Sequence, residues 1–235
     1  MDRITCHVFV ADTVLAQNRH SALLNAEERE RRAGFRQDQD RVRFTTAVAL
    51  LRLAVGARTA TPPAAVRIDR RCRRCSGPHG KPQLPGTDLH ASVSHSGARV
   101  AVALTSVAPV GVDLEEIKPK DIAGLSTLCL APGEPLERDE DFFTYWCRKE
   151  SVVKATGDGI AVPLARVLVG RAGEPPALRG YPSGDVPAAM ADLPVGPGYA
   201  GAVTVLAAGR LDVVMADAAA LLEGGGVAVS AAGRG

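Results

Sequence analysis

Asp113 and Glu115, two positions apart, lie in the stretch GVDLEEI, residues 111–117. Alternate side chains of a β-strand share a face, so Asp113 and Glu115 would point to one side, with Val112 and Leu114 on the other. Adjacent carboxylates repel each other unless a cation lies between them, and Mg²⁺ takes oxygen ligands while leaving positions open for substrate phosphates. An edge strand with one solvated face gives the same pattern, and this short stretch alone favours the edge strand.

A glutamate and a lysine recur at helical spacing in FTYWCRKESVVKATGDGI, residues 143–160. Glu150 and Lys154 would be neighbours one turn apart on one helix face. As an exposed pair they would stabilise the helix by only ~0.3–0.5 kcal/mol. The functional interpretation is that Glu150 joins the two strand carboxylates at a metal site, while Lys154 supplies positive charge for a phosphate. Trp146 is interpreted as a core residue.

Three further groups could contact an anion. In VSHSGA, Ser94, His95 and Ser96 end an expected strand at a glycine turn, where hydroxyls, an imidazole and a free amide suit a phosphate. A structural serine is the alternative; a Ser-His hydrolase is not favoured because the G-x-S-x-G pattern is absent. In PHGKP, Lys81 is held in a turn beside Pro82. The arginine-rich run 29–43, interleaved with glutamates, is typical of a solvated helix face of which a subset could meet a phosphate.

The segment CRRC, Cys72 to Cys75, has the spacing of a metal knuckle, and His79 is the nearest third ligand. Zinc sites normally show four ligands, usually as two paired clusters, and this chain has one such pair. A zinc site is therefore not favoured. A zinc-stabilised binding module built on this segment stays as an alternative function, and it predicts stoichiometric zinc and loss of the fold on chelation.

Strands and helices must position these groups. The long helical stretch 25–57 has a candidate break at Gly34, and a second helix is expected to start near Asp139. In each half a charged helix precedes an apolar strand-like segment, which suggests one α/β unit per half with a ligand between them. Strand-like segments are 6–15, 90–106, 109–117 and 198–208. The predicted fold is α/β (α+β), with an N-terminal half over 1–108, a C-terminal half over 109–223 and a disordered tail over 224–235.

Composition narrows the class of protein. The 235 residues are 46% hydrophobic and 23% charged, which is typical of a globular chain with a packed core. A net charge of +2 argues against a bulk nucleic-acid binder. The sequence contains no apolar run of the ~18 residues that a membrane helix needs. The N-terminal stretch lacks the pattern of a signal peptide, and five scattered cysteines fit reduced thiols, so we expect a cytoplasmic protein.

Taken in order, the stretches GKP, SVSHSG, GVDLEEI and FTYWCRKESVVKATGDG resemble the 4′-phosphopantetheinyl transferases of the large, surfactin-synthetase-activating type. The family signatures read roughly G-[IV]-D-[IL]-E and W-x-x-K-E-[AS]-x-x-K-x-x-G. Residues 111–115 fill the first signature. The second is filled by Trp146, Lys149, Glu150, Ser151, Lys154 and Gly157. The chain departs from the family in the glutamates among its N-terminal arginines and in the additional segment CRRCSGPH.

The resemblance implies a pseudo-dimer of two similar α/β halves, with coenzyme A bound in the cleft between them. It implies transfer of the phosphopantetheine arm of coenzyme A to a serine of an apo acyl or peptidyl carrier protein, with release of adenosine 3′,5′-bisphosphate. The metal is expected to be Mg²⁺, with Mn²⁺ as the alternative, and its ligands Asp113, Glu115 and Glu150. Glu150 would also accept the serine proton, and Lys154, or less favourably Lys149, would neutralise the pyrophosphate.

The expected contacts to coenzyme A come from both halves. They are Arg31, Arg36, Arg43, Lys81, Pro82, Ser94, His95, Asp113 and Lys154. The carrier is expected to dock on N-terminal arginines or on the segment 120–140. The protein is expected to be a monomer without nucleic-acid or membrane partners. A Mg²⁺-dependent phosphohydrolase or nuclease that uses the same carboxylates is the alternative enzyme.

Overall fold

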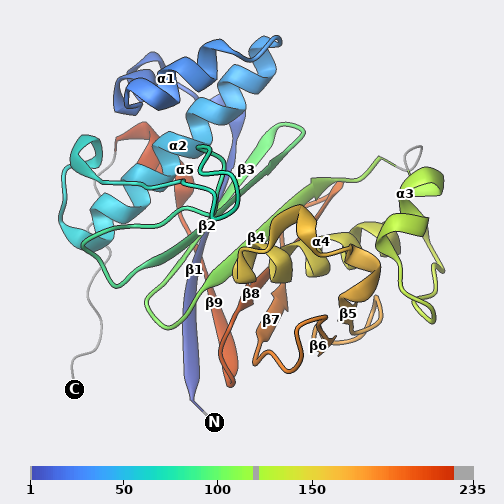
Figure 1. Ribbon diagram of the computed structural model, residues 1–235. Coiled ribbons are helices and arrows are strands. Elements are labelled where there is room, and N and C mark those ends of the chain that lie inside the picture. The colour runs from blue at the N-terminus through green and yellow to red at the C-terminus, as the bar shows by residue number, and fades with distance from the viewer. Residues whose placement is uncertain (1, 119–121, 225–235) are drawn as a thin grey trace.

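Two β-sheets and two long helices make up most of the computed structural model, which describes residues 2–118 and 122–224 (Figure 1). The strands are β1 (Arg3–Asp12), β2 (His90–Ser96), β3 (Arg99–Thr105), β4 (Val110–Glu116), β5 (Leu168–Val169), β6 (Leu178–Gly180), β7 (Ala189–Asp192), β8 (Tyr199–Val205) and β9 (Arg210–Ala216). The helices are α1 (Ala26–Ala33), α2 (Asp38–Thr59), α3 (Ile122–Cys129), α4 (Asp139–Thr156) and α5 (Ala218–Glu223). The predicted mixed α/β class is confirmed.

The first sheet has the strand order β2-β3-β1-β9, and the second has the order β4-β8-β7. Within the first sheet β1 pairs antiparallel with β3 but parallel with β9, the last strand of the chain. In the second sheet β8 pairs antiparallel with both neighbours. A separate pair, β5 and β6, lies beside α4 (Figure 1).

Alternation along the strands builds two cores. On β3, Val100, Val102 and Leu104 pack toward α2, whereas Ala101 and Ala103 face the second sheet. On β4, the apolar positions 110, 112 and 114 join the core between the sheets, which leaves Asp113 on the side of α4. Both faces of β3 are therefore buried in apolar cores. On β4 one face joins the core between the sheets, and the other face carries Asp113.

One glycine allows α4 to lie directly on β4. A Cβ added at Gly111 would lie 1.9 Å from the carbonyl oxygen of Ser151 and 2.5 Å from the backbone nitrogen of Ala155. No other residue type fits such an approach, so the glycine brings the helix backbone against the strand that carries the carboxylates. The helix then ends at Gly157, whose φ of 81° favours glycine and whose N–H donates to the carbonyl of Val153.

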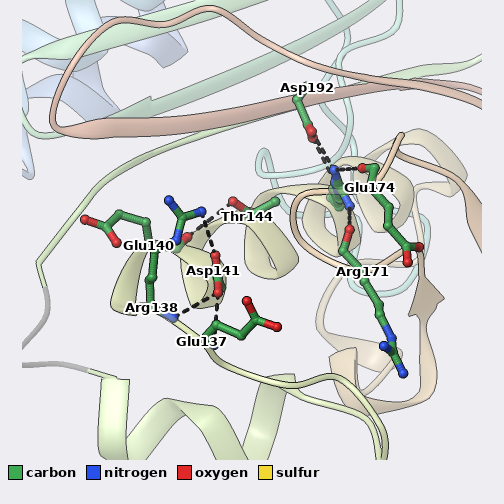
Figure 2. A network of polar contacts seen from close by, with 9 residues as sticks. Glu137, Arg138, Glu140, Asp141, Thr144, Arg171, Glu174 and Asp192 are labelled. Carbon is green, nitrogen blue, oxygen red and sulfur yellow. Dashed lines mark hydrogen bonds and ion pairs between the residues drawn. The ribbon is translucent and has the colours of Figure 1, made fainter.

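Polar contacts hold the N-terminus and the middle of α4 (Figure 2). At its N-terminus, the backbone N–H groups of Glu137 and Arg138 donate to the carboxylate of Asp141. Further along, the guanidinium of Arg148, only 1% exposed, pairs with Asp192 at 2.5 Å. The same guanidinium donates to the carbonyl oxygens of residues 170, 171 and 174. These contacts fix the rotation of α4 against β7 and the loop that follows β5.

The observed element boundaries can be compared with those predicted from the sequence. The break at Gly34 and the helix start at Asp139 are confirmed. The helix α3 was not expected, because its eight residues lack a charged face. The division at 108 and 109 and the similarity of the two halves stay predictions, although β9, assigned to the C-terminal half, pairs with β1. Apart from Gly224, the predicted tail lies outside the described residues. No helix in the described part of the chain has both the length and the apolar character to cross a bilayer.

Candidate active site

A ladder of serines joins the two sheets at the site. On β2 the hydroxyls of Ser92, Ser94 and Ser96 accept hydrogen bonds from the backbone N–H groups of residues 112, 114 and 116. The N···Oγ distances are 3.0, 3.3 and 3.0 Å. Since β2 and β4 share no backbone ladder, these side chains replace it. The period of two in SVSHS places all three hydroxyls on one face, a signal that the prediction for Ser94, His95 and Ser96 did not use and that would have added Ser92.

Two carboxylates of β4 accept hydrogen bonds from two of these hydroxyl groups. Ser94 donates to Oδ1 of Asp113 at 2.9 Å, and Ser96 donates to Oε2 of Glu115 at 2.6 Å. Asp113 is 2% exposed, while Glu115 is half-buried. The predicted placement of both carboxylates on one face is confirmed, and that face is buried against α4 and β2 rather than solvated.

The lysine of α4 reaches the same aspartate. Lys154 Nζ donates to Oδ1 of Asp113 at 2.6 Å and to the hydroxyl of Ser94 at 2.9 Å. Burial alone lowers the pKa of Lys154, but the negative charges of Asp113 and the two glutamates outweigh it, so the pKa is raised. The lysine is therefore held in its charged form beside the carboxylates.

The pKa values of the two glutamates in this region are raised. Burial, followed by the charge of Asp113, raises the pKa of Glu115 to about 7. The same two causes raise the pKa of Glu150, against the opposing effect of Lys154. Three carboxylates thus share one region with a single lysine among them, an arrangement that a divalent cation would relieve.

These groups line one pocket of about 310 Å³. Its walls are formed by Val93, Ser94, His95, Asp113, Glu115, Trp146, Glu150 and Lys154. Trp146 combines two roles, because its ring also packs against Phe142 with 5.8 Å between centroids. The interpretation of Trp146 as core was therefore incomplete, since the indole also forms a wall of the pocket.

The donor set fits a hard cation. Oδ2 of Asp113 is buried and accepts no hydrogen bond from the described residues. The thiol of Cys147 is buried near it, and burial together with Asp113 and Glu115 raises the pKa of that thiol well above its usual value. The oxygens of Asp113, Glu115 and Glu150 do not all lie within 4.8 Å of one another. Sharing one cation therefore requires at least one of these side chains to move.

The remaining expected residues lie around the pocket rather than in its wall. Lys81 Nζ donates to the carbonyls of Val110 and Ala155, which clips the start of β4 to the end of α4. Burial, followed by the charge of Arg73, lowers the pKa of Lys81 to about 8. The neighbouring Pro82 is buried.

The N-terminal arginines differ in their contacts and in their electrostatic influence on the pocket. Arg43 donates to the carbonyl of Gly97, in the turn that follows β2, and Arg31 donates to the carbonyl of Pro78. Desolvation, then Lys154, Arg43 and Arg31, lowers the pKa of His95, which connects both arginines electrostatically to the pocket. Arg36 is exposed between α1 and α2.

Lys149 lies elsewhere, which corrects its assignment as a second cation for a pyrophosphate. Its ammonium is fully buried and pairs with Glu134 at 2.6 Å. It also donates to the carbonyls of Cys129 and Leu164, so all three of its protons are used. Lys149 holds α3 and the segment after α4 in place, a role that helical spacing alone does not distinguish from ligand binding.

Part of the chain matches a known family. Residues 109–183 match the model of the 4′-phosphopantetheinyl transferase superfamily. A 4′-phosphopantetheinyl transferase of Bacillus subtilis is 29% identical over 157 residues, 63% of this chain and 66% of that protein. The 4′-phosphopantetheinyl transferase psf-1 of Bacillus pumilus is 34% identical over 135 residues, 53% and 57% of the two chains. The 4′-phosphopantetheinyl transferase HetI of a Nostoc species is 32% identical over 154 residues, 60% and 62%.

The match to each of these relatives spans less than two thirds of the relative's own length. The resemblance inferred from the motifs is nevertheless confirmed by both comparisons. The superfamily match covers β4 and α4, and with them Asp113, Glu115, Glu150 and Lys154. Ser94 and His95 lie outside it, on β2.

Proposed function

We propose that this protein transfers the 4′-phosphopantetheine moiety of coenzyme A to a serine hydroxyl of an apo acyl or peptidyl carrier protein. The observation that carries the proposal is the pocket that combines Asp113, Glu115, Glu150 and Lys154, within the segment that matches the superfamily. The carrier's serine oxygen forms a bond to the phosphorus that bears the pantetheine arm. The bond from that phosphorus to the bridging pyrophosphate oxygen breaks, and adenosine 3′,5′-bisphosphate leaves.

Glu150 is the group proposed to accept the serine proton. Its raised pKa makes it a stronger base than an ordinary glutamate once it is ionised, because a proton is bound more tightly at a buried carboxylate near Asp113. The nucleophile belongs to the carrier protein, so the pocket itself needs no nucleophile. Phosphoryl transfer asks of it mainly positioning and neutralisation of charge.

Lys154 and Ser94 are proposed to orient the pyrophosphate. Lys154 is about 30% exposed at its side chain, so its ammonium can reach a ligand in the pocket while it stays bonded to Asp113. The unpartnered Oδ2 of Asp113, with Glu115 and Glu150, would hold Mg²⁺, with Mn²⁺ as the alternative. When bound, the cation would neutralise charge that develops on the pyrophosphate oxygens.

The rest of coenzyme A is proposed to lie between the two halves of a pseudo-dimer. Three features support this placement. They are the serine ladder that joins β2 to β4, the effect of Arg31 and Arg43 on the pKa of His95, and the hydrogen bond from Lys81 to the start of β4. Arg31 and Arg43 are thus better candidates for the 3′-phosphate than Arg36, which is exposed and is not among the charges that lower the pKa of His95. The monomeric state, the cytoplasmic location and carrier docking on the segment 120–140, part of which lies outside the described residues, stay predictions.

The test is the intact mass of an apo carrier protein after incubation with this protein, coenzyme A and Mg²⁺. A gain of one phosphopantetheine that disappears with a chelator supports the proposal. If folded protein leaves several unrelated apo carriers unchanged while it cleaves nucleotides, the phosphohydrolase alternative replaces it.

A further inference from the structure

A second group of metal-ligating side chains lies outside the active site, in the loop between α2 and β2. Cys72, Cys75 and His79 bring Sγ, Sγ and a ring nitrogen within 4.8 Å of one another. In the described part of the chain this is the one set of three His, Cys, Asp or Glu residues that converges so closely. Cys75 Sγ lies 2.9 Å from Nε2 of His79, and both cysteines are free thiols.

The backbone of this loop is shaped around the sulfur atoms. The N–H of Ser76 donates to the carbonyl of Cys72 at 2.9 Å, and the N–H of Cys72 donates to the carbonyl of Gly77 at 2.8 Å. These two hydrogen bonds close the turn that carries both cysteines.

Gly77 gives an independent indication that the side chains converge on a common centre. A Cβ added at this glycine would lie 3.1 Å from the His79 ring and 3.4 Å from Sγ of Cys75. The backbone therefore passes directly under two of the three ligands. Ser76 precedes it with a φ of 59°, a conformation that costs a non-glycine residue energy and that something in the loop must offset.

Apolar packing does not hold this loop. Val66 and Leu84 are the buried hydrophobic residues on either side, and none of the buried apolar side chains comes from residues 70–80. The loop closes at its base where Asp69 and Gln83 exchange backbone hydrogen bonds and Gly80 donates to Arg70. Beyond that base, four arginines at positions 70, 71, 73 and 74 place like charges close together. Backbone hydrogen bonds shape the loop, and a cross-link between its side chains would stabilise it further.

We propose that Cys72, Cys75 and His79 bind one zinc ion, with water in the fourth tetrahedral position. Two thiolates and an imidazole are the ligand types that favour zinc over the hard cations suited to the carboxylate pocket. Tetrahedral zinc separates its ligand atoms by roughly 3.3–3.8 Å, so the observed cluster needs only a small adjustment. Binding displaces the two thiol protons, and the bound pair of thiolates neutralises the charge of the metal.

The proposed zinc ion contacts only residues of this loop. It affects the active site only by fixing the position of Lys81 and of the contact to Arg31. The carbonyl of Pro78, between the proposed ligands, accepts from Arg31, and Lys81 follows His79 by two residues. Zinc would thus order the segment that places Lys81 against β4 and α4. The proposal differs from a zinc-dependent fold, because the two cores of the sheets are built without this loop.

The experiment is a cobalt(II) titration of the full-length protein, reduced and stripped of metal with a chelator. Cobalt bound by thiolates gives a sulfur-to-metal charge-transfer band in the near ultraviolet, which cobalt on carboxylates lacks. The band is expected to saturate at about one equivalent and to disappear when about one equivalent of zinc is added. Cys75→Ser is expected to abolish the band, and His79→Gln to weaken binding by roughly tenfold or more. Arg74→Ala, an exposed change in the same loop, is the matched control and should keep the band.

Alkylation followed by mass mapping provides the second measurement. Zinc is expected to protect Cys72 and Cys75 from alkylation in the wild-type protein, and circular dichroism should show that Cys75→Ser remains folded. Three results would overturn the proposal. They are the absence of a charge-transfer band, a band that persists in Cys75→Ser, and a disulfide between Cys72 and Cys75 in protein kept under reductant with zinc present.

Discussion

Asp113 has one carboxylate oxygen that accepts two hydrogen bonds and another that is buried and accepts none from the residues that the structure describes. Leaving a charged acceptor unsatisfied is costly, so this atom is the position at which we propose that a cation binds. The sequence indicated the pairing of Asp113 with Glu115, but not its burial. Burial depends on α4 and β2, which approach only in the folded protein.

Glu150→Gln keeps the shape of the side chain but removes the proposed proton acceptor. We expect the rate of carrier modification to fall by about a thousandfold, within the range typical of general-base catalysis. Intact mass of the carrier over time measures this. Glu140→Gln, an exposed change on the same helix, should leave the rate unaltered. A Glu150→Gln rate within a factor of a few of wild type would assign the proton transfer to another group.

Lys154→Met removes the cation bonded to Asp113 and Ser94. We expect the transfer rate to fall by about tenfold, less than for Glu150→Gln, because one charge among several is lost. We also expect the free energy of unfolding without Mg²⁺ to fall by about 1–3 kcal/mol, since a buried carboxylate loses its partner. Urea unfolding with and without Mg²⁺ tests this, and Mg²⁺ should restore part of the loss. Arg166→Met, at an exposed position, is the control; an equal loss in both variants would exclude the proposed pairing.

At the scale of elements, the sequence predicted a strand over 109–117 and a helix that starts near Asp139, and the structure has β4 over residues 110–116 and α4 from Asp139. It missed Ser92, and it indicated Ser96 without its bond to β4, because the roles of both serines depend on a strand from the other sheet. It also left Lys149 as a ligand candidate, because helical spacing does not show which face meets Glu134. Local patterns thus predicted elements, whereas contacts between distant elements decided which side chains reach the pocket.

Gly111→Ala tests the approach of α4 to β4. The added methyl would overlap the backbone of α4 at Ser151, so strand and helix must separate. We expect a loss of about 3 kcal/mol or more in the free energy of unfolding, together with a loss of transfer. Urea unfolding provides the measurement. Gly124→Ala, where the structure leaves open space around the new Cβ, should cost nothing or stabilise α3 slightly. Equal stability of both variants would contradict the close packing.

Ser92→Ala tests the serine ladder away from the pocket. The hydroxyl of Ser92 is buried and accepts the N–H of Val112, so the variant leaves a buried amide without a partner. We expect the free energy of unfolding to fall by about 1–3 kcal/mol, with little change in the transfer rate of the folded protein. Thermal unfolding and the carrier assay together check this. Ser183→Ala, in an exposed turn, should change neither quantity, and a neutral Ser92→Ala would show that the ladder is dispensable.

At the scale of the molecule, the first and last strands share one sheet. β9 pairs with β1 over residues 3–9 and 210–216, and α5 then packs against α2. A chain that ends at Gly209 is therefore expected to lose cooperative unfolding, because the N-terminal sheet loses an edge strand and part of its helical cover. A chain that ends at Gly224 keeps every described element and should unfold as the full chain does. Circular dichroism during heating distinguishes the two, and a cooperative transition in the shorter chain would contradict this account.

The β1–β9 pairing also constrains how the protein is made. Arg3 at the start of β1 donates to Asp212 on β9, 209 residues further along the chain. At typical synthesis rates, the ribosome needs roughly 10–40 seconds to cover that distance. Throughout this interval one edge of β1 has no neighbour, and an unpaired strand edge is a template for association with other nascent chains. Until the last strand emerges from the ribosome, the exposed edge of β1 is thus expected to need protection by a chaperone.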